Sequence, residues 1–437
     1  NDSERYLLGL NSSFGSWNLD FWAQRHSQES VRSVPGNFVV SKLQAALNAG
    51  ILNPFGSAEA TPGAVSLKNS AIKAGNNYDQ LKEYGALVSF IYTRKATQNT
   101  YDVLLSNGNL FELPGGDAGI AVGLQRRDET FRFDPNPNTD DPTADPVIVG
   151  DTSVNSVFAE AVLPLSEKLE VQTAVRFEDH GSVVGETVDP KIAARFDATP
   201  WLALRGSYGT SFQAPSSNQQ GGIVNSGAVN YRTVAGTATC GGADLSSFIV
   251  AQVGQPVGSL KPQSAKNLNF GFVVQANNFD TSIDYWRYDY TDLIVNTQNA
   301  QAILDSSCAG VANGSPPRAS EFIERAANGQ PTKIILALQN ANQAVTDGVD
   351  LALNYRSELG AAKLGARLTL TYVNSFEFTT GITRSELAGK RNFLSGSFGS
   401  LPRLRGNVTG TVDSGPHSGF VVIRYSSAYT NDDPVVR

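Results

Sequence analysis

Residues 153–178 read SVNSVFAEAVLPLSEKLEVQTAVRFE and predict two β-strands joined by a tight turn. In the second strand, residues 169–178, apolar and polar side chains alternate. A period of two places one set on each face of a sheet. Residues 191–208 repeat the design around a turn at Thr199-Pro-Trp201. A soluble antiparallel sheet with one wet face gives the same alternation, so this stretch predicts a sheet without placing it in a membrane.

The composition favours strands and turns. The chain has 437 residues, of which 41% are apolar, 17% are charged and 41 are glycine. Glycine-rich connections are typical of many short turns rather than of long helices. No run of about 18 apolar residues occurs, so no transmembrane helix is predicted. A transmembrane β-barrel remains open, because its strands are apolar only at every second position.

Charge and motifs exclude several functions. The net charge of −7 argues against nucleic acid as a partner, because phosphate binding requires a basic surface. The three His residues lie far apart and the two Cys residues form no metal-binding pattern, so neither a metal nor a cofactor is predicted. The sequence contains no nucleophile elbow, catalytic triad or phosphate-binding loop. We therefore predict no catalytic residues and no enzymatic activity.

The connections between strands fall into two classes. About fourteen predicted strands form seven hairpins, with short turns near positions 14, 115, 166, 200, 278, 359 and 416. The predicted long loops cover about 27–85, 134–151, 213–263, 296–332 and 377–399. Every second connection of an up-and-down sheet lies at the same rim, and outer-membrane barrels carry short periplasmic turns and long outer loops. We therefore predict an all-β, antiparallel up-and-down transmembrane β-barrel, with residues 1–437 as one barrel domain.

Three further segments carry helical or ambiguous patterns. Helices are predicted over residues 41–49, with Ser41 as the cap and Gly50 as the stop, and over residues 319–327. Residues 86–94 are apolar enough for either a strand or a buried helix.

Several motifs, in this order, resemble the C-terminal part of TonB-dependent outer-membrane receptors. They are GNLFELPGG (108–116), AVGLQRR (121–127), VFAEAVLP (157–164), PKIAARF (190–196), LRGSYGTSFQAPS (204–216), LKPQS (260–264), DYWRY (284–288) and TDGVDL (346–351). Each motif is weak alone, and their shared order makes the resemblance specific. Gln125 and Gln263 stand where the family often has Glu.

The resemblance implies a function and a cellular location. Such receptors are 22-stranded barrels of the bacterial outer membrane, filled by an N-terminal plug and energised by the inner-membrane TonB complex. They import scarce, bulky nutrients such as siderophores, cobalamin or oligosaccharides. The sequence contains no recognisable plug, TonB box or closing strand, so we expect about fourteen strands of a larger barrel. The implied partners are outer-membrane lipid, a small-molecule or oligosaccharide ligand, and TonB acting through the plug.

Two other functions fit the same pattern. A passive outer-membrane pore, or a surface adhesin or phage-receptor barrel, needs neither a plug nor TonB. A soluble all-β glycan-binding protein requires the apolar faces to pack against a second sheet.

The polar face of the predicted strands supplies the candidate lumen-facing residues. These are Gln125, Arg127, Glu129, Glu160, Glu170, Arg176, Glu178, Lys191, Arg195, Arg205 and Arg367. They can contact a plug or a solute, or they can pair with one another across neighbouring strands, which is the expected filling of a polar barrel interior.

Aromatic residues near strand ends form a second group. The candidates for an interfacial aromatic girdle are Trp17, Trp201, Tyr208, Tyr285, Tyr372 and Tyr429. Binding of a sugar or an aromatic ligand is the alternative role. The acidic loop at residues 134–145 offers carboxylates to Ca²⁺, but it lacks the ligand spacing of an EF-hand and is predicted to be a solvated loop.

The two cysteines are predicted to form a disulfide. Cys240 precedes the strand near 267 and Cys308 follows the strand near 282, so one tight turn separates them and both fall at the long-loop rim. An exported compartment is oxidising, which allows such a bridge to persist and to join two large loops. Two unpaired thiols are the alternative.

Thiol labelling tests the Cys240–Cys308 bridge. We expect a maleimide reagent to leave the unfolded, unreduced chain unlabelled and to label both cysteines after reduction, because a disulfide sulfur is not a nucleophile. Two reactive thiols without reduction would refute the bridge.

Overall fold

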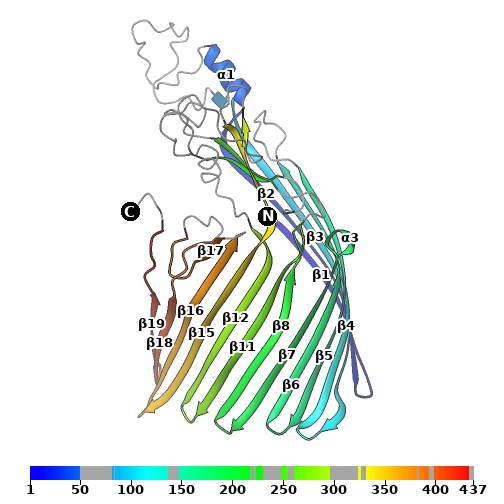
Figure 1. Ribbon diagram of the computed structural model, residues 1–437, viewed down its shortest axis with the longest axis vertical. Coiled ribbons are helices and arrows are strands. Elements are labelled where there is room, and N and C mark those ends of the chain that lie inside the picture. The colour runs from blue at the N-terminus through cyan, green and yellow to red at the C-terminus, as the bar shows by residue number, and fades with distance from the viewer. Residues whose placement is uncertain are drawn as a thin grey trace.

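A computed structural model describes residues 1–49, 81–82, 84–135, 147–216, 219, 223–229, 248–253, 260–295, 323–325, 331–380, 383–392 and 398–432. Most of these residues lie in one antiparallel sheet of fifteen strands, which Figure 1 shows as a curved wall of tilted strands. Within the described residues, no helix is long and apolar enough to cross a membrane.

The strand order of the sheet follows the chain. The strands along this path are β1 (Asp2–Phe14), β2 (Trp17–Phe38), β3 (Leu87–Leu113), β4 (Gly116–Pro135), β5 (Ile148–Ser166), β6 (Leu169–Asp179), β7 (Glu186–Thr199), β8 (Leu202–Gln213), β11 (Gln263–Ala276), β12 (Phe279–Val295), β15 (Gln339–Leu359), β16 (Ala362–Thr380), β18 (Leu404–Ser414) and β19 (His417–Ser426). A short strand, β17 (Thr383–Glu386), pairs with β16 beside this path. The predicted up-and-down antiparallel architecture is confirmed.

All seven predicted short turns are present, and each leaves two residues between its strands, as at 15–16, 277–278 and 415–416. Gly15, with φ of 60°, and Asn277, with φ of 48°, show why these residue types recur there. The commonest two-residue hairpin turns need positive φ at a central position, which Gly and Asn adopt at the lowest steric cost. The turns gather at the lower rim in Figure 1, and the other connections leave from the opposite rim.

The rim opposite the turns carries helices and a second sheet. The helices are α1 (Val40–Asn48) and α3 (Gly181–Val184). The second sheet has the order β13 (Ile323–Arg325), β14 (Pro331–Ala337), β10 (Phe248–Val253) and β9 (Ile223–Val229). Strand β10, in the region predicted as loop 213–263, pairs in parallel with residues 333–337 of β14. Strand β14 also pairs with β13 from the predicted loop 296–332, so one sheet joins the two regions.

Several predicted boundaries differ from the structure. Residues 27–38, 148–151 and 377–380 lie in predicted loops, but in the structure they extend β2, β5 and β16. These strands continue past the point where the alternation in the sequence fades, because their backbone groups still pair with a neighbouring strand. The ambiguous segment 86–94 lies almost entirely in β3.

The two predicted helices have opposite outcomes. Helix α1 confirms the first, although it starts at Val40, and Val39 at its N-cap makes no side-chain capping bond. The helix predicted over 319–327 is wrong, because residues 323–325 form β13 and pair with β14. Tertiary pairing has overridden local helix propensity there.

One face of the main sheet is apolar across many strands. Leu124 lies opposite Val157, Val157 opposite Phe177, and Phe177 opposite Val188. Leu124, Val157 and Val188 are 54%, 47% and 60% exposed, which is unusual for aliphatic side chains. An apolar face of this width marks a surface that meets an apolar environment.

The opposite face is polar. The row one residue further along carries Asp102, Gln125, Ser156, Glu178 and Thr187, each opposite the next across β3 to β7. Asp102, Ser156 and Glu178 of this row are buried, and Gln125 and Thr187 are half-buried. In these rows the sheet therefore separates an apolar face from a polar one.

A segment beyond β16 packs against the polar face. Leu387 forms a buried cluster with Ala344 and Phe378, which lie opposite each other in β15 and β16. Phe398 adds ring contacts to Phe378 with centroids 4.9 Å apart. Part of the predicted loop 377–399 is thus folded against the sheet.

Gly271 provides the gap through which two charged residues meet. Arg205 in β8 and Asp284 in β12 both lie opposite Gly271, which occupies the strand between them. Arg205 Nε and Nη2 donate to the two carboxylate oxygens of Asp284 at 2.7 and 2.5 Å. A Cβ at Gly271 would overlap the Asp284 carboxylate.

We therefore expect Gly271→Val to destabilise the folded barrel by about 2 kcal/mol, because it adds a side chain without space and separates a bidentate ion pair. Urea unfolding of the protein in detergent micelles measures this effect. Gly410→Val is the matched control, since a Cβ there meets no atom within 4 Å. Equal stability of the two variants would contradict this account.

Candidate functional site

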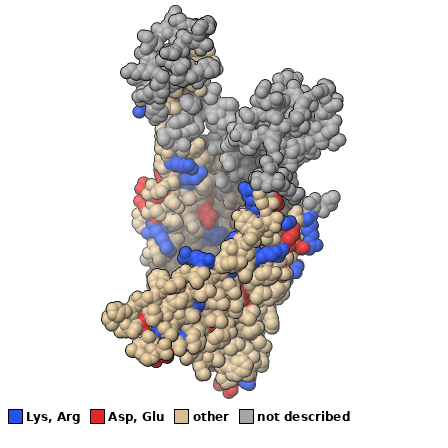
Figure 2. All heavy atoms as spheres, turned by 90° about the vertical axis from the view of Figure 1, so that its left-hand side faces the viewer, with Lys and Arg blue, Asp and Glu red and all other residues tan. Residues whose placement is uncertain are grey.

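The eleven polar residues predicted to face the lumen share one face of the sheet. Alternation along each strand and register between strands bring them together. They are Gln125, Arg127 and Glu129 in β4, Glu160 in β5, Glu170, Arg176 and Glu178 in β6, Lys191 and Arg195 in β7, Arg205 in β8 and Arg367 in β16. Figure 2 shows the side on which the molecule is hollowed, with acidic and basic groups inside the hollow.

Most of their ion pairs run along strands rather than between them. Arg127 pairs with Glu129 at 2.8 Å, Arg176 with Glu178 at 2.5 Å and Arg195 with Asp197 at 3.0 Å. Residues two apart in a strand share a face, so a long arginine side chain can lie along its own strand. The expected cross-strand pairing is found between Arg205 and Asp284. Arg195 lies opposite Arg205, and each turns to its own acidic partner.

The remaining charged candidates are less constrained. Glu170 accepts a hydrogen bond from Gln172 Nε2 at 2.9 Å. Within the described part of the chain, Glu160, Lys191 and Arg367 form no ion pair.

Arg176 is the centre of a hydrogen-bond network that crosses β3 to β6. Its Nε donates to Glu178 Oε1 at 2.5 Å, and its Nη2 donates to Gln125 Oε1 at 2.8 Å and to Ser156 Oγ at 3.0 Å. Gln125 Nε2 in turn donates to Asp102 Oδ1 at 2.6 Å. One guanidinium thus organises residues from neighbouring strands, because its planar donors point in fixed directions.

Glu178 connects this network to His180. Ser156 Oγ donates to Glu178 Oε1 at 3.1 Å, and His180 Nε2 lies 3.0 Å from Glu178 Oε2. The Glu178 side chain is 8% exposed and that of His180 is 2% exposed. The His180 ring also meets Phe212 edge-on, with centroids 5.2 Å apart. The network therefore ends at the buried Glu178 carboxylate, which lies beside His180 and its contact with Phe212.

Sequence reasoning missed four members of these contacts, namely Asp102, Ser156, His180 and Asp284. Asp102 and Ser156 lie within predicted strands but resemble ordinary surface polar residues in the sequence. Asp284 lies in the DYWRY motif, which gave the one usable signal. His180 lies just after β6, and only its distance to Glu178 identifies it.

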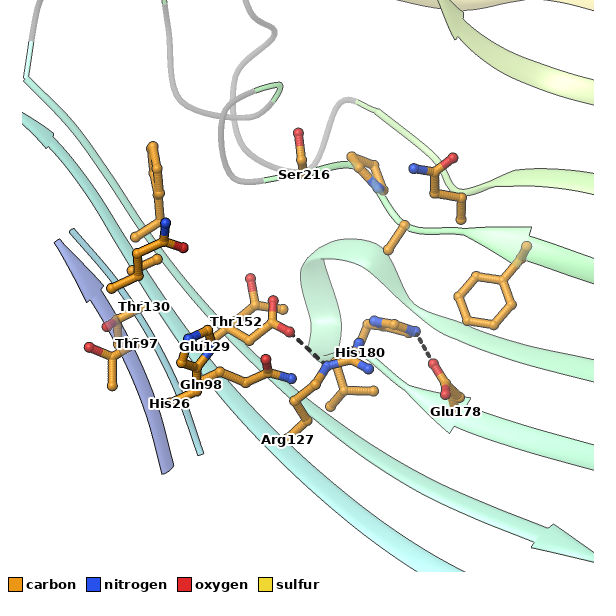
Figure 3. A pocket seen from close by; sticks show the side chains of 18 residues that line it. His26, Thr97, Gln98, Arg127, Glu129, Thr130, Thr152, Glu178, His180 and Ser216 are labelled. Atoms are coloured by element: carbon orange, nitrogen blue, oxygen red, sulfur yellow. Dashed lines mark ion pairs between the residues drawn. The ribbon is translucent and has the colours of Figure 1, made fainter. Parts of the chain in front are cut away.

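The network borders a cavity of about 860 Å³ on the polar face. Figure 3 shows its lining converging from several elements, with His26, Gln98, Glu129 and Thr152 on the strands and Ser216 on the segment after β8. Each lining segment lies nine or more residues from the nearest two-residue turn, so the cavity is close to the long-connection rim. A concave site with a few placed polar groups is the usual form of a small-molecule site.

The predicted interfacial aromatics lie at different heights. Trp17 and Trp201 lie at two-residue turns. Tyr208, Tyr285 and Tyr372 lie further up on the apolar face, opposite Ile192, Phe270 and Val349. Tyr429 follows β19 and is 47% exposed. Their role as a girdle stays a prediction.

Other predicted sites fall largely outside the described residues. Cys240 and Cys308 lie there, as do residues 136–146, which include most of the acidic loop. Among the residues that the structure describes, no group of three His, Cys, Asp or Glu side chains is placed to hold a metal ion.

The family is decided by a match over almost the whole chain. The family described as "TonB dependent receptor-like, beta-barrel" matches residues 2–436. The chain belongs to this family of TonB-dependent receptors. It is a β-barrel of the bacterial outer membrane, and its family is one of receptors and transporters rather than enzymes.

Known receptors share this fold at low sequence identity. The probable TonB-dependent siderophore receptor PirA of Acinetobacter baumannii is 24% identical over 164 residues, which cover 38% of this chain and 20% of that protein. The crystal structure of PirA from Acinetobacter baumannii has a TM-score of 0.53 at 16% identity, covering 98% of this chain and 51% of that chain.

Two further structures extend the comparison. A mutant of the ferric enterobactin receptor PfeA from Pseudomonas aeruginosa has a TM-score of 0.59 at 13% identity, covering 97% of this chain and 48% of that chain. The RagAB peptide transporter gives 0.55 at 12% identity, covering 97% and 47%. The chain thus spans about half the length of these three solved structures, and the likeness to them is one of fold alone.

The Arg176 network is expected to stabilise the barrel. We predict that Arg176→Met lowers the free energy of unfolding by about 3 kcal/mol, because it leaves the buried Glu178 carboxylate without its cation. Arg195→Met removes the same kind of pair where both partners are exposed and is expected to cost less than about 1 kcal/mol. Urea unfolding of both variants in the same detergent measures the difference, and equal losses would contradict the role of burial.

Proposed function

We propose that the protein carrying this chain is a TonB-dependent transporter that imports a scarce, bulky nutrient across the outer membrane. The observation that carries the proposal is the cavity of about 860 Å³ on the polar face, near the long-connection rim. A pocket of this size accommodates a ligand of siderophore or oligosaccharide dimensions. The names of PirA and PfeA, which are receptors for siderophores and ferric enterobactin, support an iron chelate as the ligand class.

The charged polar face fits the same proposal. Its eleven polar residues line the lumen, where they contact a plug domain or a passing solute and pair with their neighbours. Lipid contacts the apolar face, and the aromatic residues near the strand ends sit at the membrane interfaces. TonB acts through the plug, and residues 1–437 form part of one barrel domain.

Transport is tested by uptake in a host that lacks its own siderophore receptors. We expect the protein carrying this chain to support uptake of a ⁵⁵Fe-labelled siderophore only when the host has a functional TonB. Uptake that proceeds equally without TonB would indicate the passive pore, and surface binding of the ligand without any uptake would indicate the adhesin-type barrel.

A cavity-filling variant links uptake to the site. Thr152→Trp places an indole in the cavity. It is expected to reduce uptake at least about tenfold, because the indole fills part of the volume that the ligand would occupy. Thr369→Trp, on the same face but in β16 outside the cavity, is the control. Both variants are first checked for normal amounts in the outer membrane. An equal loss of uptake in both variants would show that the cavity is not the site that transport uses.

A further inference from the structure

We propose that the cavity selects a ligand that is electrically neutral and rich in hydroxyl or amide groups. This inference rests on the proposed function, and it concerns the class of substrate rather than the existence of transport. Two observations support it: the charged side chains of the described lining are paired, and its other groups are mostly hydroxyl, amide or aromatic.

Each charged side chain of the described lining has a compensating partner. Arg127 pairs with Glu129 at 2.8 Å, and both line the cavity. Glu178 is paired with Arg176, which lies just behind the lining. Figure 3 shows the Arg127–Glu129 contact at the cavity wall. The described lining therefore has no excess positive charge with which to offset a polyanionic ligand.

A polyanion would have to break one of these pairs. Transfer of an ionised group into a site without a counter-charge costs several kcal/mol after relaxation, and the existing acidic partners would add repulsion. A neutral ligand leaves both pairs in place. The balance of charge therefore favours neutral ligands over anionic ones of the same size.

The uncharged part of the lining offers matching contacts. Gln98, Thr152 and Ser216 supply amide and hydroxyl groups, which both donate and accept hydrogen bonds. Phe131 and Phe212 supply aromatic surface. Hydroxyls, amides and rings together suit a ligand whose polar groups are uncharged and whose skeleton is partly apolar.

Two ligand sources share this chemistry, namely a neutral ferric trihydroxamate chelate and a neutral oligosaccharide. The test measures binding of both to the purified protein in detergent, beside a trianionic ferric tricatecholate of similar size. We expect at least one neutral probe to bind at least about tenfold more tightly than the tricatecholate. Its affinity should change less than about twofold between 0.05 and 0.5 M salt, because screening acts on charged ligands.

A charge variant makes the inference specific to the site. Glu129→Gln frees the Arg127 charge and is expected to strengthen tricatecholate binding at least about threefold while leaving the neutral probe within about twofold. Asp197→Asn is the matched control, since it breaks an equivalent Arg–Asp pair on the same face beside a two-residue turn, outside the cavity.

The outcomes separate this inference from the proposed transport. Tightest binding of the tricatecholate would overturn the inference while leaving a TonB-dependent importer intact. Failure of every neutral probe to bind would also overturn it. TonB-independent uptake would overturn the transport proposal whichever probe binds.

Discussion

Antiparallel register is the constraint on which the rest of this structure depends. Side chains in a strand alternate with a period of two, so a slip of one residue would turn every side chain of that strand to the other face. The apolar row from Leu124 to Val188 and the polar row from Asp102 to Thr187 exist only because β3 to β7 keep one alignment. Two-residue turns fix that alignment at one rim, because their length leaves no room for a slip.

Strand length then determines where a ligand can be held. A tilted strand crosses the bilayer in about 9–11 residues, whereas β2 and β3 have 22 and 27 residues. The surplus lies on the side away from the two-residue turns. The cavity is lined there, by residues such as His26, Gln98 and Glu129. The long strands thus carry the cavity wall beyond the length that the membrane requires.

Local sequence predicted the parts of the fold that depend on near neighbours. Alternation in residues 169–178 and the turn residues at each hairpin were enough to place the strands and their turns, and the order of motifs indicated the family. The second sheet was not predictable in this way, because β10 and β14 are separated by many residues and pair in parallel. Residues 319–327 carry a helical pattern, yet β13 forms there because pairing with β14 outweighs a weak local preference.

The site shows the same limit at the level of side chains. The sequence identified Gln125, Arg176 and Glu178 as members of one face, since alternation determines the face. It could not show that Arg176 reaches Gln125 across Ser156, because that contact depends on the register of three strands at once. His180 and Asp284 acquire their partners only in three dimensions.

The paired charges also bear on how a ligand is captured. Three arginines of the polar face, Arg127, Arg176 and Arg195, are each held by an acid two residues away on the same strand. Each such pair is nearly neutral at a distance, so these paired charges create little long-range field. Under the proposed function, these pairs add little electrostatic steering of a ligand toward the cavity, and its association rate is expected in the range of uncharged partners. Tight binding of the proposed nutrient would then come from slow dissociation, which depends on hydrogen bonds and apolar contacts formed after water has left the site. The hydroxyl, amide and aromatic lining supplies those contacts.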